Sequence, residues 1–524
     1  MAISKPANIE GRILVNGDVR SGDFARRPVL SAPTFVSNRG VPRAEVLGST
    51  PDVSPAIMVE ALQAAAAAWD RGTGGWPKAH MGQRIAALQG FCHDMAKTRN
   101  AIVELLMWEI GKTRADSESE FDRTLTYIND TLEAAKQLDR DNARLQFNGG
   151  IIAQIRRAPL GVTLCMGPFN YPLNETFTTL IPALVMGNTA VVKMARFGQL
   201  FWEHLLEPFA KNLPAGVVNI VNGDGKTIIG EAMKTGLFDI LAFIGSSRVG
   251  DIIRSQHPRL HRLRCILGLD AKNPAIVFPD ADLNVTMAET VKGSLTFNGQ
   301  RCTALKILFV HRSIEKEFTR RFVEAVEALK RGFPWDEGVH ITHLPDPGKG
   351  DYLRSLIDDA VAKGATLANP ERGGKSEGQL FHPAVLSHVS MNSRLAVEEQ
   401  FGPVVPIVPF DDVQEFEDYV VSSNFGQQAS LFGKDPATLG KLIDKLANQI
   451  CRVNLNTQCQ RGPDVYPFTG RKDSAEGTLS VGDALRAFSI RSMVAAKQDP
   501  MGKTVVKSVL DSNASEFLST DFLI

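Results

Sequence analysis

The sequence predicts an α/β protein with more than one domain. Strand and helix patterns alternate over about residues 160–250 and again over about 270–480, and such alternation implies parallel sheets with right-handed crossover connections. The chain has 524 residues, too many for one hydrophobic core, which suggests two or three domains. Because ligands of such folds bind at the carboxyl ends of the strands, we expect the functional residues there.

The N-terminal part is predicted to be helical after an extended lead. Residues 1–50 are rich in Pro, Gly, Ser and Arg and read as irregular and extended. Residues 54–69 predict a helix, because a serine suited to the N-cap and a proline suited to the first turn precede an Ala-rich run. Two amphipathic helices are expected over 82–110 and 113–138.

A hairpin over 146–152, with Asn148-Gly149 as its turn, precedes the alternating blocks. In the first block we expect strands at 162–166, 189–193, 217–221 and 240–244, and helices at 177–184, 200–212, 227–233 and after Ser246. In the second we expect strands at 275–278, 306–310, 404–408 and 450–453, and helices at 285–297, 313–331 and 352–363. A strand at 488–494 and a tail of unassigned role, 499–524, complete the chain.

Composition excludes several classes of function. Lys+Arg and Asp+Glu both number 58, so no basic field favours nucleic acid or an anionic membrane. The six cysteines are scattered without a CxxC pair, which argues against disulfides or zinc and fits a reducing cytosol, so we expect a cytoplasmic protein without a metal. Residues 1–18 lack the apolar core of a signal peptide, and no apolar run approaches membrane-spanning length.

Cys302 is the strongest candidate for a reactive residue. It lies in Phe297-Asn298-Gly299-Gln300-Arg301-Cys302-Thr303, a small polar stretch after a helical run. Such a setting suits an exposed thiol, and the adjacent cation of Arg301 favours the thiolate, which is the nucleophile. An ordinary loop cysteine is the alternative for this heptapeptide taken alone.

Further segments favour a reactive Cys302 over an ordinary loop cysteine. They are Gly167-Pro168-Phe169-Asn170-Tyr171-Pro172, Pro182-Ala183-Leu184, Gly187-Asn188, Lys193, Phe243-Ile244-Gly245-Ser246, Lys272-Asn273-Pro274, Glu399-Gln400-Phe401-Gly402-Pro403, Gln460-Arg461-Gly462-Pro463-Asp464 and Pro467-Phe468-x-Gly470. Together they resemble the aldehyde dehydrogenase superfamily over about residues 50–495. Within it, the Asn170 and Arg461 segments are similar to the non-phosphorylating glyceraldehyde-3-phosphate dehydrogenases.

The resemblance implies the aldehyde dehydrogenase fold, in which a doubly wound dinucleotide-binding domain and an α/β catalytic domain accompany a small β oligomerisation element. The expected parts are the N-terminal part of the cofactor-binding domain (1–144), the hairpin of the oligomerisation element (145–160), the dinucleotide-binding domain (161–269), the catalytic domain (270–483), the oligomerisation strand (484–498) and the tail (499–524). A homodimer or homotetramer is implied as well.

The same resemblance implies covalent catalysis. The Cys302 thiolate attacks an aldehyde, and the Asn170 amide and the Cys302 backbone N–H stabilise the oxyanion. Hydride transfer to a nicotinamide then leaves a thioester, which water hydrolyses. For a phosphorylated aldehyde, the implied substrate-binding residues are Arg123, Tyr171, Arg301, Thr303 and Arg461. The alternative for the arginines is pairing with local acids, which for Arg123 are close in sequence.

A nicotinamide cofactor is implied in the first alternating block. The implied cofactor-binding residues are Lys193, Arg196, Gly225, Gly245, Ser246, Glu399 and Phe401. Ser246 opens a helix whose N-terminal amides can receive pyrophosphate. Arg196 stands where the family often carries an acid that pairs with the free ribose hydroxyl, so we expect NADP in preference to NAD. Gly223–Thr227 lacks the first glycine of a nucleotide triphosphate-binding loop, so we do not expect an ATP site.

Two departures concern the hydrolytic step. Gly268 stands where the superfamily carries its general-base glutamate, and Thr179 where it carries a lysine. Glycine cannot activate water, so we expect another group to do so. Glu175 is the candidate, with an acid of the first helical turn as its structural alternative; Asp270 is a weaker one.

Three functions therefore remain open. The first is NADP-dependent oxidation of D-glyceraldehyde 3-phosphate to 3-phosphoglycerate. The second is an acylating member of the same superfamily, which passes the thioester to coenzyme A or phosphate. The third is a hydrolysis-impaired paralogue, an interpretation that Gly268 favours and the intact Cys302 and Asn170 oppose.

Overall fold

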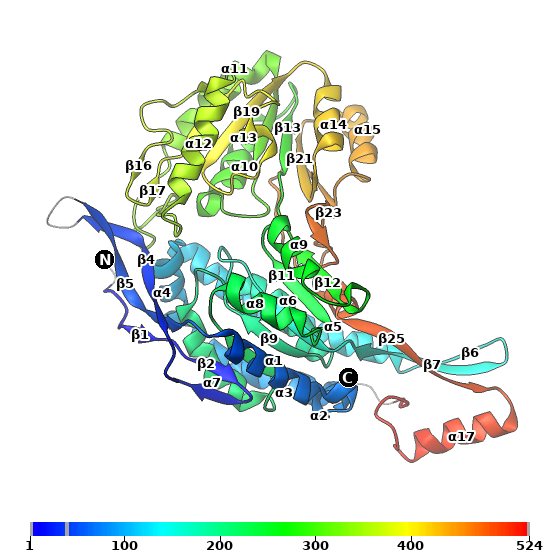
Figure 1. Ribbon diagram of the computed structural model, residues 1–524. Coiled ribbons are helices and arrows are strands. Elements are labelled where there is room, and N and C mark those ends of the chain that lie inside the picture. Colours follow the sequence, from blue (N-terminus) through cyan, green and yellow to red (C-terminus); the bar gives the residue numbers. More distant parts are fainter. Residues whose placement is uncertain (1–3, 37–40, 521–524) are drawn as a thin grey trace.

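The computed structural model describes residues 4–36 and 41–520. Two largely parallel sheets form the centres of two lobes, and a small antiparallel sheet extends from the first lobe as an arm (Figure 1). The first sheet has eight strands in the order β24-β12-β11-β8-β9-β10-β2-β3. Its central parallel strands are β8 (Val162–Met166), β9 (Thr189–Lys193), β10 (Val218–Val221), β11 (Ile240–Ile244) and β12 (Arg264–Gly268); β2 (Ile13–Val15), β3 (Asp18–Arg20) and β24 (Ala475–Glu476) are antiparallel.

Helices cover both faces of the first sheet, because its strands are apolar on both sides. Along β9, Val191 packs with one core cluster and Val192 with the other. The helices of this lobe are α1 (Pro55–Trp69), α2 (Gly75–Lys78), α3 (Met81–Ala96), α4 (Arg99–Ile110), α5 (Arg114–Asn142), α6 (Asn174–Val185), α7 (Glu203–Asn212), α8 (Gly225–Lys234), α9 (Ser247–Ser255) and α16 (Val481–Ala487). The helix α6 is buried along its whole length, which fixes its N-terminus firmly in the lobe.

The second lobe repeats the arrangement around a seven-stranded sheet in the order β15-β18-β19-β14-β13-β21-β22. Its strands are β13 (Pro274–Val277), β14 (Ile307–His311), β15 (Thr366–Leu367), β18 (Ala384–Ser387), β19 (Val404–Phe410), β21 (Gln428–Phe432) and β22 (Arg452–Leu455), all parallel except β15. Its helices are α10 (Leu283–Leu295), α11 (Arg312–Glu327), α12 (Lys349–Ala362), α13 (Arg394–Val397), α14 (Val413–Ser422) and α15 (Pro436–Leu446). Two short antiparallel pairs accompany it: β16 (Ser376–Glu377) with β17 (Leu380–Phe381), and β20 (Phe425–Gly426) with β23 (Arg471–Lys472).

The arm consists of β6 (Leu145–Asn148), β7 (Ile151–Pro159) and β25 (Ser489–Lys497), all antiparallel. It carries α17 (Pro500–Asp511) on the connection that leads back to the first lobe (Figure 1). The predicted hairpin and the predicted strand at 488–494 therefore belong to one sheet. Its turn is Gly149-Gly150 and not Asn148-Gly149, because both glycines have positive φ, the geometry that a two-residue hairpin turn requires.

The expectation of irregular structure over residues 1–50 was wrong within the described residues; residues 1–3 and 37–40 lie outside them. The segment forms strands, of which β1 (Ile9–Glu10), β4 (Arg26–Val36) and β5 (Pro42–Pro51) make a separate sheet. Its prolines were misleading, because β4 is an edge strand and its register shifts near Pro28 and Pro33. Edge strands and bulges tolerate proline.

Four other points of the predicted organisation need correction. The helix predicted over 82–110 is two helices, because Thr98 donates its hydroxyl to the Met95 carbonyl (2.7 Å) where α3 ends. The predicted helix at 200–212 begins with a short 3-10 turn before α7. Strands β12, β18 and β21 were missed, since short, fully buried parallel strands lack the alternation that identifies a strand. Residues 475–476 join the first sheet, although the predicted unit 270–483 contains them.

Candidate active site

One cavity of about 1360 Å³ brings together nearly all the residues singled out from the sequence. It opens at the carboxyl ends of β8, β9, β11 and β12, whose last residues line it. The predicted residues in its wall are Arg123, Asn170, Tyr171, Glu175, Lys193, Arg196, Gly245, Ser246, Arg301, Cys302, Thr303, Glu399, Phe401 and Arg461. Gly225 is not in the wall; it begins α8, and a Cβ built on it would lie 3.8 Å from Lys193 Nζ.

Cys302 is half-buried and its backbone is held firmly. Its carbonyl oxygen accepts hydrogen bonds from Asn273 Nδ2 (2.7 Å) and Lys306 Nζ (3.1 Å). Burial raises the pKa of the Cys302 thiol, the charge of Glu175 raises it further, and the cations Lys306 and Arg461 oppose the rise. The expectation of an exposed thiol with a thiolate favoured by Arg301 was therefore wrong. The Arg301 guanidinium points elsewhere, to the Gly293 carbonyl (2.9 Å).

Asn170 fixes an amide donor beside the cysteine loop. Its side chain is buried, and Nδ2 donates to the Gln300 carbonyl at 2.8 Å. This bond uses one of the two amide hydrogens. The amide is thereby oriented by the same loop that carries Cys302, in the wall of the same cavity.

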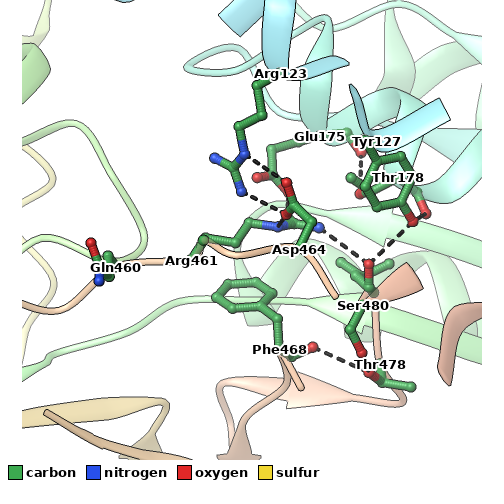
Figure 2. A network of polar contacts seen from close by, with 12 residues as sticks. Arg123, Tyr127, Glu175, Thr178, Gln460, Arg461, Asp464, Phe468, Thr478 and Ser480 are labelled. Atoms are coloured by element: carbon green, nitrogen blue, oxygen red, sulfur yellow. Dashed lines mark hydrogen bonds and ion pairs between the residues drawn. The ribbon is translucent and has the colours of Figure 1, made fainter. Parts of the chain in front are cut away.

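A four-membered ion network closes one end of the cavity (Figure 2). Arg123 makes a two-pronged contact with Asp464, through Nε (2.8 Å) and the terminal NH2 nitrogen (2.7 Å). Arg461 donates through Nε to Asp464 (3.1 Å) and through another nitrogen to Glu175. Burial alone raises the pKa of Asp464, but the Arg123 hydrogen bond and the charge of Arg461 outweigh it and hold that pKa below its ordinary value.

The local acids near Arg123 have other partners. Glu120 accepts from the backbone N–H groups of Leu173 and Asn174 (3.1 Å each), so it caps α6. Asp122 pairs with Arg99 at 2.7 Å. The alternative of local pairing for Arg123 is therefore not what the structure shows, yet the guanidinium is neutralised by a more distant acid, Asp464.

Glu175 lies in the first turn of α6. Gly268 ends β12, and a Cβ built on it would meet only side-chain carbons of Ile244 and Leu479, 3.4 Å away at the nearest. Thr179 is buried and donates its hydroxyl to the Thr176 carbonyl (2.7 Å). Neither of these two residues offers a base, whereas Glu175 places a carboxylate in the cavity wall.

The opposite end of the cavity is cationic at its mouth. Burial lowers the pKa of Lys193 to about 8, so its ammonium persists at neutral pH. Arg196 is largely exposed, stacks over the Phe197 ring and lies 3.6 Å from Asp346. Both cations are therefore available to an anion at this end.

Two carboxylates, Asp270 and Glu399, line the part of the cavity where the cofactor is expected. Asp270 accepts from the Ser247 backbone N–H (2.8 Å) and hydroxyl (2.6 Å) at the start of α9. One of the helix amides expected to receive a pyrophosphate is thus engaged by the chain itself, through Asp270. Glu399 is ion-paired with Lys306, and burial raises the pKa of Glu399.

Tyr171 and Thr303 complete the wall near Cys302. Burial raises the pKa of the Tyr171 phenol, so it remains an O–H donor at neutral pH. The Lys112 ammonium lies 3.4 Å from the centre of the Tyr171 ring, and Lys112 pairs with the buried Glu120. These contacts fix the aromatic ring in place.

Sequence reasoning missed two residues that organise the site. Lys306 bonds both the Cys302 carbonyl and Glu399. The sequence did contain a signal for Lys306. A lysine at the start of an apolar strand is expected to be buried, and a buried ammonium needs hydrogen-bond acceptors. Asp464 holds two arginines, and it was noted only as part of a sequence motif.

Neither a metal centre nor a membrane span was found in the part of the chain that the structure describes. Within residues 4–36 and 41–520, no three His, Cys, Asp or Glu side chains are grouped so that they could hold a metal ion. No helix of the same residues is long and apolar enough to cross a membrane.

Comparison with known proteins identifies a family to which this chain is similar. The model of the aldehyde dehydrogenase family matches residues 36–494. The NADP-dependent glyceraldehyde-3-phosphate dehydrogenase of Streptococcus equinus is 32% identical over 463 residues, which cover 86% of this chain and 92% of that protein. The protein of the same name from Arabidopsis thaliana is 30% identical over 421 residues, with 79% and 83% covered. A solved structure of the enzyme so named from Bacillus halodurans C-125, complexed with NADP, is 31% identical, covers 94% of this chain and 100% of that one, and superposes with a TM-score of 0.83.

Proposed function

The chain belongs to the aldehyde dehydrogenase family, and from that premise we propose that it oxidises D-glyceraldehyde 3-phosphate to 3-phosphoglycerate with NADP as the oxidant. One observation carries the proposal. A single cavity contains Cys302 and Asn170 between an arginine-bearing end and an end that bears Lys193 and Arg196. The names of the relatives support both the cofactor and the substrate.

Cys302 supplies the nucleophile. Its sulfur forms a bond to the aldehyde carbon, and the carbonyl oxygen becomes an oxyanion. The Asn170 amide, held by the Gln300 carbonyl, and the Cys302 backbone N–H are the donors for that charge. Since burial raises the thiol pKa, the Lys306 and Arg461 cations are the groups in this chain that favour the thiolate.

The residues at the cationic end suit a phosphorylated dinucleotide, because their ammonium and guanidinium groups can donate hydrogen bonds to phosphate oxygens. Lys193 and Arg196 can contact the adenosine ribose and its phosphate, and Gly245, Ser246, Glu399 and Phe401 can line the remainder. When bound, NADP would accept a hydride and leave a thioester on Cys302. Lys306 would then hold Glu399 and the Cys302 backbone in a fixed relation.

The arginine-bearing end is where we place the substrate phosphate. Arg123, Arg301 and Arg461 line it, and the Tyr171 hydroxyl and Thr303 add neutral donors. Arg301 donates to the Lys292 and Gly293 carbonyls and to the Gln458 side-chain oxygen, so no acid cancels its charge in these contacts. A dianion is therefore the chemical group that this end suits best.

Gly268 favours a second candidate function. The space beside it holds the side-chain carbons of Ile244 and Leu479 and leaves the thioester without the family's base on β12. An acylating enzyme, which transfers the thioester to coenzyme A or phosphate, needs no such base. Product analysis with and without each acceptor separates the two functions.

The test of the main proposal is aldehyde-dependent formation of NADPH, followed by its absorbance. We expect 3-phosphoglycerate as the product without added phosphate, and a loss of at least three orders of magnitude in rate for Cys302→Ser, as is usual for removal of a covalent nucleophile. Equal rates in the parent protein and Cys302→Ser would refute the proposal.

We also propose that the chain assembles as a homodimer or homotetramer through the arm. Apolar side chains are exposed there, among them Phe147 and Met493 at 58% and 61%, and a partner sheet edge would cover them. Sedimentation of the intact chain measures the mass. A monomer at micromolar concentration would contradict this proposal.

A further inference from the structure

The anion-binding end of the cavity already contains a carboxylate of the chain itself. Arg461 is buried, with 4% of its side chain exposed, and all three guanidinium nitrogens have partners. They donate to Asp464, to Glu175 and to the Leu479 carbonyl. These three bonds use three of the five N–H donors of the guanidinium, and Arg461 lines the cavity, so an incoming anion can reach it from the cavity and compete with Glu175 for it.

The charges of the network cancel. Arg123 and Arg461 carry two positive charges, and Glu175 and Asp464 carry two negative charges (Figure 2). A phosphate that enters this end would meet no net attraction from the four residues as they stand. Removal of one carboxylate from Arg461 restores a net positive charge at the place where the phosphate binds.

Glu175 is the partner that can leave. Asp464 receives two bonds from Arg123 in addition to the one from Arg461, and it is not in the cavity wall. Glu175 is held by Arg461 through one carboxylate oxygen, and it lines the cavity. Exchange of Glu175 for an anion from the cavity thus breaks one ion pair and leaves the Arg123–Asp464 pair intact.

The released carboxylate would stay near the thioester. Glu175 and Cys302 line the same cavity, and the charge of Glu175 raises the pKa of the Cys302 thiol. Release from Arg461 leaves the Glu175 carboxylate in the wall of the cavity that also contains Cys302, where it can accept a hydrogen bond from a water molecule.

We propose that Glu175 is an internal counter-ion that the anionic group of the substrate displaces from Arg461, and that the released carboxylate then accepts the proton of the hydrolytic water. In that step the water oxygen bonds to the thioester carbon, the proton passes to Glu175, and the carbon–sulfur bond breaks to return the Cys302 thiolate. No electrons are exchanged. The inference rests on the proposed function, since it needs a thioester on Cys302 and an anionic substrate.

The first test separates the anion from the aldehyde. The intact chain is acylated with propanal and NADP, and the thioester is followed in single-turnover experiments with and without inorganic sulfate, a tetrahedral dianion that cannot accept an acyl group. We expect sulfate to accelerate release of propanoate at least tenfold. A deacylation rate that does not depend on sulfate would overturn the inference.

The second test uses Glu175→Gln, with Glu317→Gln as the matched control. Glu317 also pairs with arginines, Arg320 and Arg321, but on the exposed surface of α11. In Glu175→Gln we expect sulfate to bind at least tenfold more tightly by calorimetry and deacylation to slow at least tenfold and lose its sulfate dependence. A purely structural role for Glu175 predicts weaker or unchanged sulfate binding, which would contradict the inference.

The outcomes distinguish the two proposals. If no aldehyde yields NADPH in the parent protein, the proposed function fails. If NADPH appears in a rapid first turnover and sulfate has no effect on the following step, only the present inference fails. Should Glu175→Gln not fold, the sulfate experiment on the unmodified chain decides alone.

Discussion

We propose that Gly268 stands where the family carries its general base. It ends β12 with no positive φ, and a Cβ there would meet only ordinary van der Waals contacts with Ile244 and Leu479. The backbone at this position therefore does not require glycine.

Gly268→Glu is expected to restore a base on β12. A positioned general base contributes roughly 10²- to 10⁴-fold, so we expect thioester hydrolysis to rise by about two orders of magnitude and to become independent of sulfate. Single-turnover deacylation measures this. Gly268→Gln is the matched control, because it fills the same space without a base, and equal acceleration by both variants would contradict the prediction.

We expect the preference for NADP to depend on Arg196. Its side chain is 73% exposed at the cavity mouth, where it can pair with a ribose phosphate. Arg196→Glu should lower kcat/KM for NADP at least tenfold, because a carboxylate repels the phosphate, while the value for NAD stays equal or rises. Arg43→Glu, an exposed charge reversal on β5, is the control and should change neither value. An unchanged NADP/NAD ratio in Arg196→Glu would contradict this role.

At the scale of elements, the C-terminal tail is the part whose role sequence patterns left open. Beyond α17, the chain returns to the arm, where the Ser519 carbonyl accepts from Gln154 Nε2 (2.5 Å) and from Arg156 (2.7 Å). The Ser519 N–H donates in turn to Gln154 Oε1 (3.1 Å). Gln154 and Arg156 are both buried in β7. The tail therefore satisfies polar groups at the base of the arm.

A chain that ends at Gln498 should be less stable, because it lacks these three hydrogen bonds. Each is worth roughly 0.5–1.5 kcal/mol, so we expect a loss on the order of 3 kcal/mol in the free energy of unfolding, with NADPH formation retained. Urea titration measures the change. A chain that ends at Thr520 keeps all three bonds and should be more stable than the chain that ends at Gln498; equal stability of both truncated chains would argue against this role.

At the scale of the whole molecule, the sequence predicted the elements better than their arrangement. Strands β9 and β11 have the predicted bounds, because regular apolar runs stood between clear turn signals. The placement of 475–476 beside β12 was not predictable, since two residues carry no periodicity and the pairing spans more than 200 positions.

The same contrast holds for the site. The family resemblance led to Cys302, Asn170 and the arginines, which line one cavity. The partners of those residues could not be predicted, because Glu175 and Arg461 are 286 positions apart and nothing local selects Arg461 over another cation. Charge neutralisation depends on residues that only folding brings together, and it changes the interpretation of Arg123 and Arg461.

Glu109 links the stability of the whole fold to pH. It lies at the end of α4, is buried, and accepts backbone hydrogen bonds from Gln199 (2.7 Å) and Leu200 (3.0 Å), which follow the Arg196 loop. Burial raises its pKa to about 7, above the ordinary value of 4.5, although the backbone bonds oppose the shift. The folded state thus binds more protons than the unfolded state between these values. The contribution of Glu109 is fully present below pH 4.5 and is lost as the pH rises through 7.

Glu109→Gln should remove this dependence, because the amide does not titrate. One pKa unit corresponds to about 1.4 kcal/mol, so the free energy of unfolding of the parent protein should fall by on the order of 3 kcal/mol more than that of the variant between pH 5 and pH 8. Urea titrations at the two pH values measure the difference. Glu104→Gln, a half-buried position on the same helix, is the control and should follow the parent protein. If Glu109→Gln also follows the parent protein, the buried carboxyl does not couple folding to pH, and the loop that carries Arg196 is held by its packing alone.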